Sequence, residues 1–363
     1  MMGTALSGKS RVVRRVVAAC LWSLGGLAAA QPSPVPEAKT PRVLTEPAVR
    51  SPKALGAATL AVARAGQRLV AVGERGTVLL SDDAGATWRQ AQVPVQATLT
   101  AVQFINQRTG WAGGHLGVIL RSDDAGETWV KQLDGVKAAE AVAAAAKGNT
   151  DERAQRTARR FVEEGPDKPF FDIHFSDEQH GVAVGAYNLA FTTRDGGRTW
   201  TPSLHNLPNP KNLHLYGVRL VGSNVYIAGE QGLLLKSEDG GASFRTLPSP
   251  YKGSFFGLLA ARSGTLFAYG LRGTVVRSVD QGASWEKLET GVPVSISAAV
   301  ELDRAELVLL SQTGDLLTSR DDGLSFSKSA PVGGPLPAAG LAPADGQHLV
   351  LASLRGMRRQ TNP

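Results

Sequence analysis

The acidic side chains are the first place to look for chemistry, because two carboxyl groups that flank a glycosidic bond can cleave it. The acids expected near one face of the fold, outside six repeated octets described below, are Glu74, Glu163, Glu164, Asp167 and Glu230. Their spacing specifies no such pair. The sequence therefore assigns no catalytic residue.

The histidines and the cysteine offer no metal or nucleophile site. Histidines stand at 115, 174, 180, 205, 214 and 348, without H-x-x-x-H or H-E-x-x-H spacing. The single cysteine, Cys20, lies in a segment expected to be removed, which leaves no thiol for a disulfide, zinc or catalysis. No G-x-S-x-G elbow occurs. We expect no metal, no cofactor and no small-molecule substrate.

Arginines could instead recognise a partner. Arg153, Arg156 and Arg160 follow the i, i+3, i+7 spacing of one helix face, and a planar guanidinium binds carboxylates bidentately. They predict a docking stripe for an acidic partner, and the alternative is an ordinary solvated face. The opposite face, expected to pack on the fold, consists of Ala154, Ala158, Phe161 and Val162.

Six octets of the form S/T-x-D-x-G-x-S/T-W/F supply the framework that positions these side chains. Their closing aromatics are 41, 71, 44, 41 and 41 residues apart, and a period near forty is typical of propeller blades or solenoids. The aspartate can accept backbone N–H bonds within a turn, and the glycine two residues later can adopt positive φ. These structural aspartates are Asp83, Asp124, Asp195, Asp239, Asp280 and Asp321.

Each octet follows a period-two or apolar run and a glycine-bounded turn, such as 72–76 or 229–232. Four strands per repeat predict an all-β, seven-bladed β-propeller over residues 55–360 with these Asp boxes as turns. The seventh repeat, near 348–356, has no octet, and Arg42 to Arg50 could supply its missing outer strand and remove an open edge. Six blades with a C-terminal tail is the alternative.

One helical-hairpin insertion, 133–169, is predicted between blades 2 and 3. Its helices are expected over 136–146 and from a cap at Thr150 or Asp151 to Glu164. Chain direction places it on the face opposite the Asp boxes, with the glycine turns. Three other residues are expected at the same position of their glycine turns as Arg75, Arg272 and Arg355 in theirs: His115, Asn188 and Gln231. The cations of these turns and of the links between blades are Arg75, Lys211, Lys252, Arg272 and Arg355. They are predicted to bind a partner, and the alternative is that they are ordinary solvated residues.

The N-terminus resembles an export signal over residues 1–30, with basic residues, an apolar stretch and Ala28-Ala-Ala30. Cleavage after Ala30 is expected, and an uncleaved anchor is the alternative. A proline-rich linker follows over 31–54. The net charge is +7, and because 1–30 holds four of the 39 basic residues and none of the 32 acids, the remainder would carry +3. The sequence lacks a nucleic-acid-binding motif, so no nucleic acid partner is expected.

The doublet of glycine turn and Asp box, clearest at 73–88 and 229–244, resembles the photosystem II stability/assembly factor family of propellers with BNR repeats. The resemblance spans about 55–358. It implies a non-enzymatic assembly chaperone, exported to the periplasm or, in a photosynthetic source, the thylakoid lumen. It also implies an arginine cluster that contacts a client.

The sequence thus predicts an exported, monomeric protein-binding scaffold for a membrane or envelope protein complex, photosystem II-like if the source is photosynthetic. The alternative is an Asp-box glycoside hydrolase of sialidase-like type. Against this alternative, the Arg-Ile-Pro motif of sialidases is absent, and only Tyr187 and Tyr251 fall near the predicted binding face.

Overall fold

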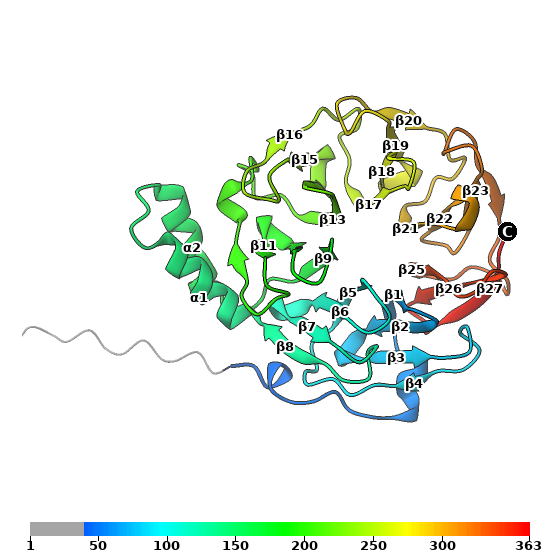
Figure 1. Ribbon diagram of the computed structural model, residues 1–363, viewed down its shortest axis with the longest axis horizontal. Helices are drawn as coiled ribbons and strands as arrows, with labels where there is room; N and C mark the ends of the chain where they lie inside the picture. The colour runs from blue at the N-terminus through cyan, green and yellow to red at the C-terminus, as the bar shows by residue number, and fades with distance from the viewer. Residues whose placement is uncertain (1–39) are drawn as a thin grey trace, which may run out of the picture. The chain divides into compact units, whose positions relative to one another are not determined.

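The structure, a computed structural model, describes residues 40–363. The predicted export signal and the linker residues 31–39 lie outside this range. Within it, the strands form seven antiparallel sheets, each built from consecutive strands in chain order (Figure 1). Six sheets have four strands and the last has three.

The first three sheets precede residue 203. Sheet 1 contains β1 (Thr59–Ala65), β2 (Arg68–Gly73), β3 (Val78–Ser81) and β4 (Arg89–Gln90). Sheet 2 contains β5 (Leu99–Phe104), β6 (Gly110–Gly114), β7 (Ile119–Ser122) and β8 (Val130–Leu133). Sheet 3 contains β9 (Phe170–Phe175), β10 (Gly181–Gly185), β11 (Ala190–Thr193) and β12 (Thr201–Pro202).

The other four sheets follow. Sheet 4 contains β13 (Leu215–Val221), β14 (Asn224–Gly229), β15 (Leu234–Ser237) and β16 (Arg245–Thr246). Sheet 5 contains β17 (Phe255–Ala260), β18 (Leu266–Gly270), β19 (Val275–Ser278) and β20 (Glu286–Leu288). Sheet 6 contains β21 (Ile296–Glu301), β22 (Leu307–Ser311), β23 (Leu316–Ser319) and β24 (Ser327–Ser329), and sheet 7 contains β25 (Ala338–Pro343), β26 (His348–Ser353) and β27 (Arg358–Thr361).

The sheets surround a centre, and the first strand of each sheet is innermost (Figure 1). Every first strand contacts the first strands of the sheets on either side, including β1 with β25. At that junction Thr59 Oγ1 donates to Ser353 O at 3.2 Å, and Ser353 N donates to Thr59 Oγ1 at 3.1 Å. The ring is therefore closed, as the predicted all-β propeller-like fold requires.

The N-terminal segment differs from its prediction. Within the described residues sheet 7 has three strands, and Arg42 to Arg50 runs instead beside sheets 1 and 2. Ala48 N donates to Val93 O at 2.9 Å, and Lys131 Nζ donates to Leu44 O at 2.7 Å. Leu44 is buried among apolar residues of these two sheets. Burial of this side chain, about 1.5–3 kcal/mol, holds the segment there rather than at sheet 7.

The two predicted helices are present as α1 (Gly135–Ala146) and α2 (Glu152–Glu164). Asp134 caps α1 by accepting from Val136 N and Lys137 N, and Asp151 caps α2 by accepting from Arg153 N. Their apolar sides join the core of sheets 2 and 3. The predicted apolar face is correct for Ala154, Ala158 and Phe161 but wrong for Val162, which is 57% exposed.

The six octets form third turns with one shared set of hydrogen bonds. In the first, Thr87 Oγ1 and N donate to the two carboxylate oxygens of Asp83 at 2.6 and 2.9 Å, and Ser81 Oγ donates at 2.8 Å. Gly85 N donates to Ser81 Oγ at 2.8 Å. These bonds, led by that from the Thr87 hydroxyl, lower the pKa of Asp83 to about 2.

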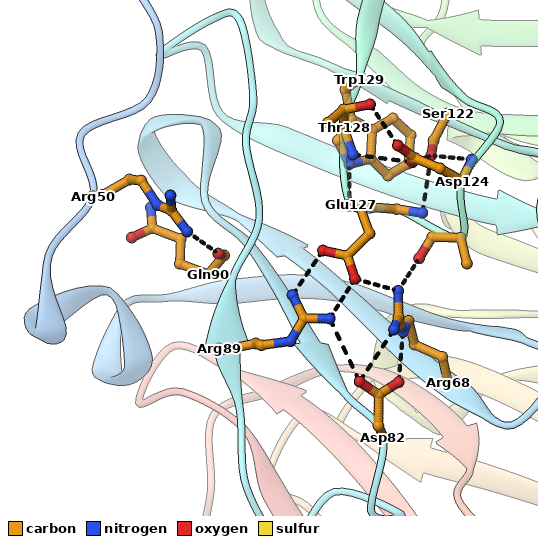
Figure 2. A network of polar contacts seen from close by, with 12 residues as sticks. Arg50, Arg68, Asp82, Arg89, Gln90, Ser122, Asp124, Glu127, Thr128 and Trp129 are labelled. Carbon is orange, nitrogen blue, oxygen red and sulfur yellow. Dashed lines mark hydrogen bonds and ion pairs between the residues drawn. The ribbon is translucent and has the colours of Figure 1, made fainter.

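Side chains of one sheet also bind the Asp box of the next. In Figure 2, Arg68 and Arg89 of sheet 1 lie between Asp82 and Glu127, the latter in the second box. Arg277 of sheet 5 repeats this arrangement with Asp322 of the sixth box. These contacts join neighbouring sheets on the face that carries the first and third turns, called here the Asp-box face.

Candidate partner-binding face

The opposite face, called here the insertion face, carries the second turns, the links between sheets and the hairpin. In all seven sheets of residues 40–363, the first strand has a bulge at its second residue, which is skipped in the pairing. In sheet 1, for example, Thr59 pairs with Gly73 and Ala61 with Val72, so Leu60 is unpaired. The bulge residues are Leu60, Thr100, Phe171, Tyr216, Phe256, Ser297 and Ala339.

The second turns are fixed to these bulges. The first N–H of each turn donates to the carbonyl just before the first strand, as from Glu74 N to Ala58 O at 3.0 Å and from Leu271 N to Ser254 O at 3.0 Å. The backbones approach so closely that a Cβ on Gly73 would lie 2.0 Å from Ala58 O. Bulges re-aim side chains beside binding sites, and here they build a rigid rim.

The rim surrounds a central cavity of about 190 Å³ lined by all seven bulge residues. Three aromatic residues on sheets 3 to 5, Phe171, Tyr216 and Phe256, form what we call the aromatic arc. The ring centroids of Phe171 and Tyr216 are 5.2 Å apart, and those of Tyr216 and Phe256 are 5.6 Å apart. These spacings are typical of favourable aromatic pairs.

Tyr187 and His214 connect this arc to the hairpin. The centroids of these two rings lie 4.6 Å apart, and the centroid of the His214 ring lies 6.0 Å from those of both Phe171 and Tyr216. Tyr187 N donates to His214 Nδ1 at 2.8 Å, which makes Nδ1 the acceptor. The Arg160 guanidinium on α2 lies 5.7 Å from the centre of the Tyr187 ring. Aromatic residues therefore run from α2 to the cavity mouth.

Deeper in the cavity, the Asp172 carboxylate accepts from Arg219 Nη1 at 2.7 Å and from Val218 N at 3.0 Å. Among the described lining residues, Asp172 is the single carboxylate, and so the cavity lacks the pair that glycoside hydrolysis needs. Burial raises the pKa of Tyr269 to about 12, which disfavours a tyrosinate nucleophile. Burial, with a smaller effect of Arg219, lowers the pKa of the nearby His174 to about 3.

The predicted turn and link cations lie around this face without forming one cluster of mutual contacts. Lys211 Nζ donates to Gln231 Oε1 at 3.3 Å. The side chains of four others make no hydrogen bond or ion pair to another part of residues 40–363, and all four are exposed: Arg75, Lys252, Arg272 and Arg355. Arg75 and Arg272 occupy the middle of their turns with φ of 53° and 56°.

Two expected turn positions are off by one residue. In the turns between the second and third strands of sheets 2 and 3, the positions equivalent to Arg75 are Leu116 and Tyr187, and not His115 and Asn188. Asn188, with a φ of 68°, stands where the turn of sheet 1 has Gly76. Asn188 is buried, and its side-chain amide donates to Leu204 O at 2.9 Å. The exposed aromatic ring of Tyr187 therefore stands where Arg75 and Arg272 stand in their own turns.

The helix arginines already have partners within the chain. Arg156 pairs with Glu152 at 3.0 Å, Arg160 pairs with Glu164, and Arg153 Nη2 donates to Asn209 O at 2.7 Å. Exposed pairs of this i,i+4 type contribute only about 0.3–0.5 kcal/mol. An acidic partner could replace them at little energetic cost.

No cluster of three or more potential metal ligands is found in the described residues. In the same range, every helix is too short or too polar to cross a membrane. The sequence reasoning missed the aromatic arc. A signal is present at the start of the first strand in six of the seven sheets of residues 40–363. It is a buried residue, then a variable one, then Ala or Gly, as in Leu215-Tyr-Gly217 and Phe255-Phe-Gly257, and sheet 3 departs from it with Asp172.

The fold and this face define an all-β propeller with an aromatic-lined central mouth and exposed cations. Residues 152–253 match the family described as Photosynthesis system II assembly factor YCF48. A curated relative, the Photosystem II assembly lipoprotein Ycf48 of Synechococcus sp. (strain CC9902), is 37% identical over 76 residues. That alignment covers 21% of this chain and 23% of the relative's length. The family resemblance predicted from the sequence is confirmed.

Two solved structures show the same fold at low identity. A solved structure of YCF48 bound to D1 peptide is similar to this chain with a TM-score of 0.62 at 15% identity. The superposition covers 88% of this chain and 96% of the YCF48 chain. A GH74 enzyme of Niastella koreensis has a TM-score of 0.60 at 14% identity. This superposition covers 84% of this chain and 52% of the enzyme's chain.

Proposed function

We propose that this protein is a non-enzymatic, exported scaffold that binds a membrane or envelope protein through the insertion face during assembly of a complex. The seven sheets act as the seven blades of an Asp-box propeller, and the protein works as a monomer in the periplasm, or in the thylakoid lumen of a photosynthetic source. The observation that carries the proposal is the exposed set of cations beside a rigid aromatic mouth. The likeness to a YCF48 structure with a bound D1 peptide supports a photosystem II-like client.

The cations suit an acidic client. Arg75, Lys252, Arg272 and Arg355 have no carboxylate partner in the described residues, whereas nearby acids are engaged. Glu74 Oε1 accepts from Ala58 N at 3.1 Å, and Glu230 Oε2 accepts from His214 N at 2.8 Å. A field of one sign speeds the encounter with an oppositely charged partner.

Capture of proteins from envelope extracts, followed by mass spectrometry, tests this function. The Lys252→Ala/Arg272→Ala variant should lose its partner at physiological salt, and so should the triple Arg153→Ala/Arg156→Ala/Arg160→Ala variant. A matched control, Arg194→Ala/Arg198→Ala, removes the same charge as the double variant from the third Asp box and should keep the partner. Equal loss in the control and the face variants would contradict the proposed face, and retention by the triple variant would contradict the helix stripe.

The glycoside hydrolase alternative draws support from the GH74 likeness. It requires a second carboxylate near Asp172, and the described cavity lining holds none. Incubation with sialylated and glucan substrates should therefore release no sugar. Turnover that is abolished by Asp172→Asn would refute the scaffold proposal.

A further inference from the structure

The central mouth is lined unequally. On sheets 3 to 5 the bulge residues are the aromatic arc, whereas sheets 1, 2, 6 and 7 contribute Leu60, Thr100, Ser297 and Ala339. Three of these four residues are small, and they leave open space beside the aromatic wall. Phe171, Tyr216 and Phe256 are each partly exposed to that space.

The size of the cavity limits what can enter. Its volume of about 190 Å³ is below the roughly 300–1,000 Å³ of sites for small molecules and cofactors. It exceeds a cavity of roughly 150 Å³ that accepts one benzene ring. One aromatic side chain therefore fits, and a sugar chain does not. An entering ring could pack on the arc with the edge-to-face geometry that the arc already shows.

The charge around the mouth defines the rest of the ligand. Lys252 lies on the link that leads to β17, and Arg272 lies in the second turn of sheet 5, which is bonded to the residue before β17 through Leu271 N and Ser254 O. Both cations therefore lie near the start of the strand that carries Phe256. Neither side chain has a partner among the described residues. At the other end of the arc, Arg160 lies against Tyr187. A segment crossing the mouth would meet cations at both ends of the arc.

We propose that the aromatic arc is an anchor site for one phenylalanine or tyrosine side chain of an acidic, extended segment of the partner protein. This inference rests on the proposed function, since it assigns the contact that the insertion face makes. The cations attract the acidic flanks, and the rigid rim of bulges and turns holds the three rings in place before binding, which reduces the entropy lost on association.

Fluorescence anisotropy with the full chain and labelled nine-residue peptides tests the anchor. The probes are an acidic peptide with a central phenylalanine, the same peptide with a central alanine, and a lysine-flanked peptide with the phenylalanine. The protein variants are Phe256→Ala, which shortens the arc, and Ser297→Trp, which fills the cavity from the neighbouring sheet 6. Leu324→Ala, at a side chain 65% exposed in the sixth Asp box, is the control.

We expect the acidic phenylalanine peptide to bind at least about tenfold more tightly than either other peptide. Phe256→Ala and Ser297→Trp should weaken it at least about tenfold, and Leu324→Ala should leave it unchanged. Equal binding of the phenylalanine and alanine peptides to the wild-type protein would overturn the anchor without relying on any variant. If Lys252→Ala/Arg272→Ala then still weakened both peptides, the proposed function would stand; if it did not, the face itself would be refuted.

Discussion

The contact between Arg277 and Asp322 should stabilise the junction of sheets 5 and 6. Arg277 Nη2 donates to Asp322 Oδ2 at 2.6 Å, and Arg277 Nε donates to Asp322 O at 2.8 Å. Thr265 Oγ1 donates to the same carboxylate oxygen at 2.8 Å. The side chains of Arg277 and Asp322 are 15% and 35% exposed.

Hydrogen bonds to charged groups contribute roughly 1.5–3 kcal/mol each when buried. Solvent partly screens this pair, and Thr265 would still donate to the carboxylate, so Arg277→Met should lower the free energy of unfolding by about 2 kcal/mol. Asp322→Asn keeps the side-chain shape and suits the φ of 56° at this position. In a double-mutant cycle, the two changes should show a coupling energy of about 1–1.5 kcal/mol.

Urea unfolding followed by tryptophan fluorescence measures this coupling, provided that all four proteins show the same m-value. Arg320→Met is the control. Arg320 pairs with Glu306, but its own side chain is 75% exposed to solvent. That change should reduce stability by less than about 0.5 kcal/mol. A coupling energy near zero for Arg277 and Asp322 would refute the view that Asp boxes hold neighbouring sheets together.

Two further predictions concern the turns. The pKa of Asp280 is lowered to about 2, chiefly by the hydrogen bond from the Ser284 hydroxyl. The contribution of Asp280 to stability is therefore complete above the unfolded pKa near 4 and is lost as the pH falls towards 2. In an acid titration monitored by circular dichroism, Asp280→Asn should lose less stability than the wild-type protein, and an equal loss in the two proteins would contradict this. Gly232→Ala should lower the free energy of unfolding by more than about 3 kcal/mol, because its Cβ would lie 1.9 Å from Tyr251 O at a φ of 77°. Gly240→Ala, at φ 69° with open space, should lower it by only about 1–2 kcal/mol, and thermal unfolding compares the two; similar losses would refute the steric explanation.

Local sequence signals predicted the elements whose stabilising contacts are also local. The second helix begins after the Asp151 cap and ends at Glu164, as expected. The bonds that shape each Asp box join residues no more than four positions apart, as from Gly85 N to Ser81 Oγ and from Thr87 Oγ1 to Asp83. In these segments the side chain that stabilises the conformation is a near neighbour in sequence, so its spacing is visible before folding.

Predictions that depended on distant packing fared less well. Arg42 to Arg50 resembles a spare strand, but the buried Leu44 and the carbonyl of Val93 hold it beside sheets 1 and 2. Val162 completes an apolar helix face in the sequence, yet the helix faces solvent at that position. Which surface a segment covers depends on the neighbours available after the ring closes.

The sequence by itself determined the repeat, the turns, the hairpin and the surface cations, because each follows from residue type and short-range spacing. Only the tertiary structure decided that Phe171, Tyr216 and Phe256 face one cavity. These residues are 40 or more positions apart in the chain, and an aromatic residue at the start of a strand is equally compatible with a buried core. Closure of the ring brings the first strands together, and the bulge in each strand turns these three rings toward the mouth.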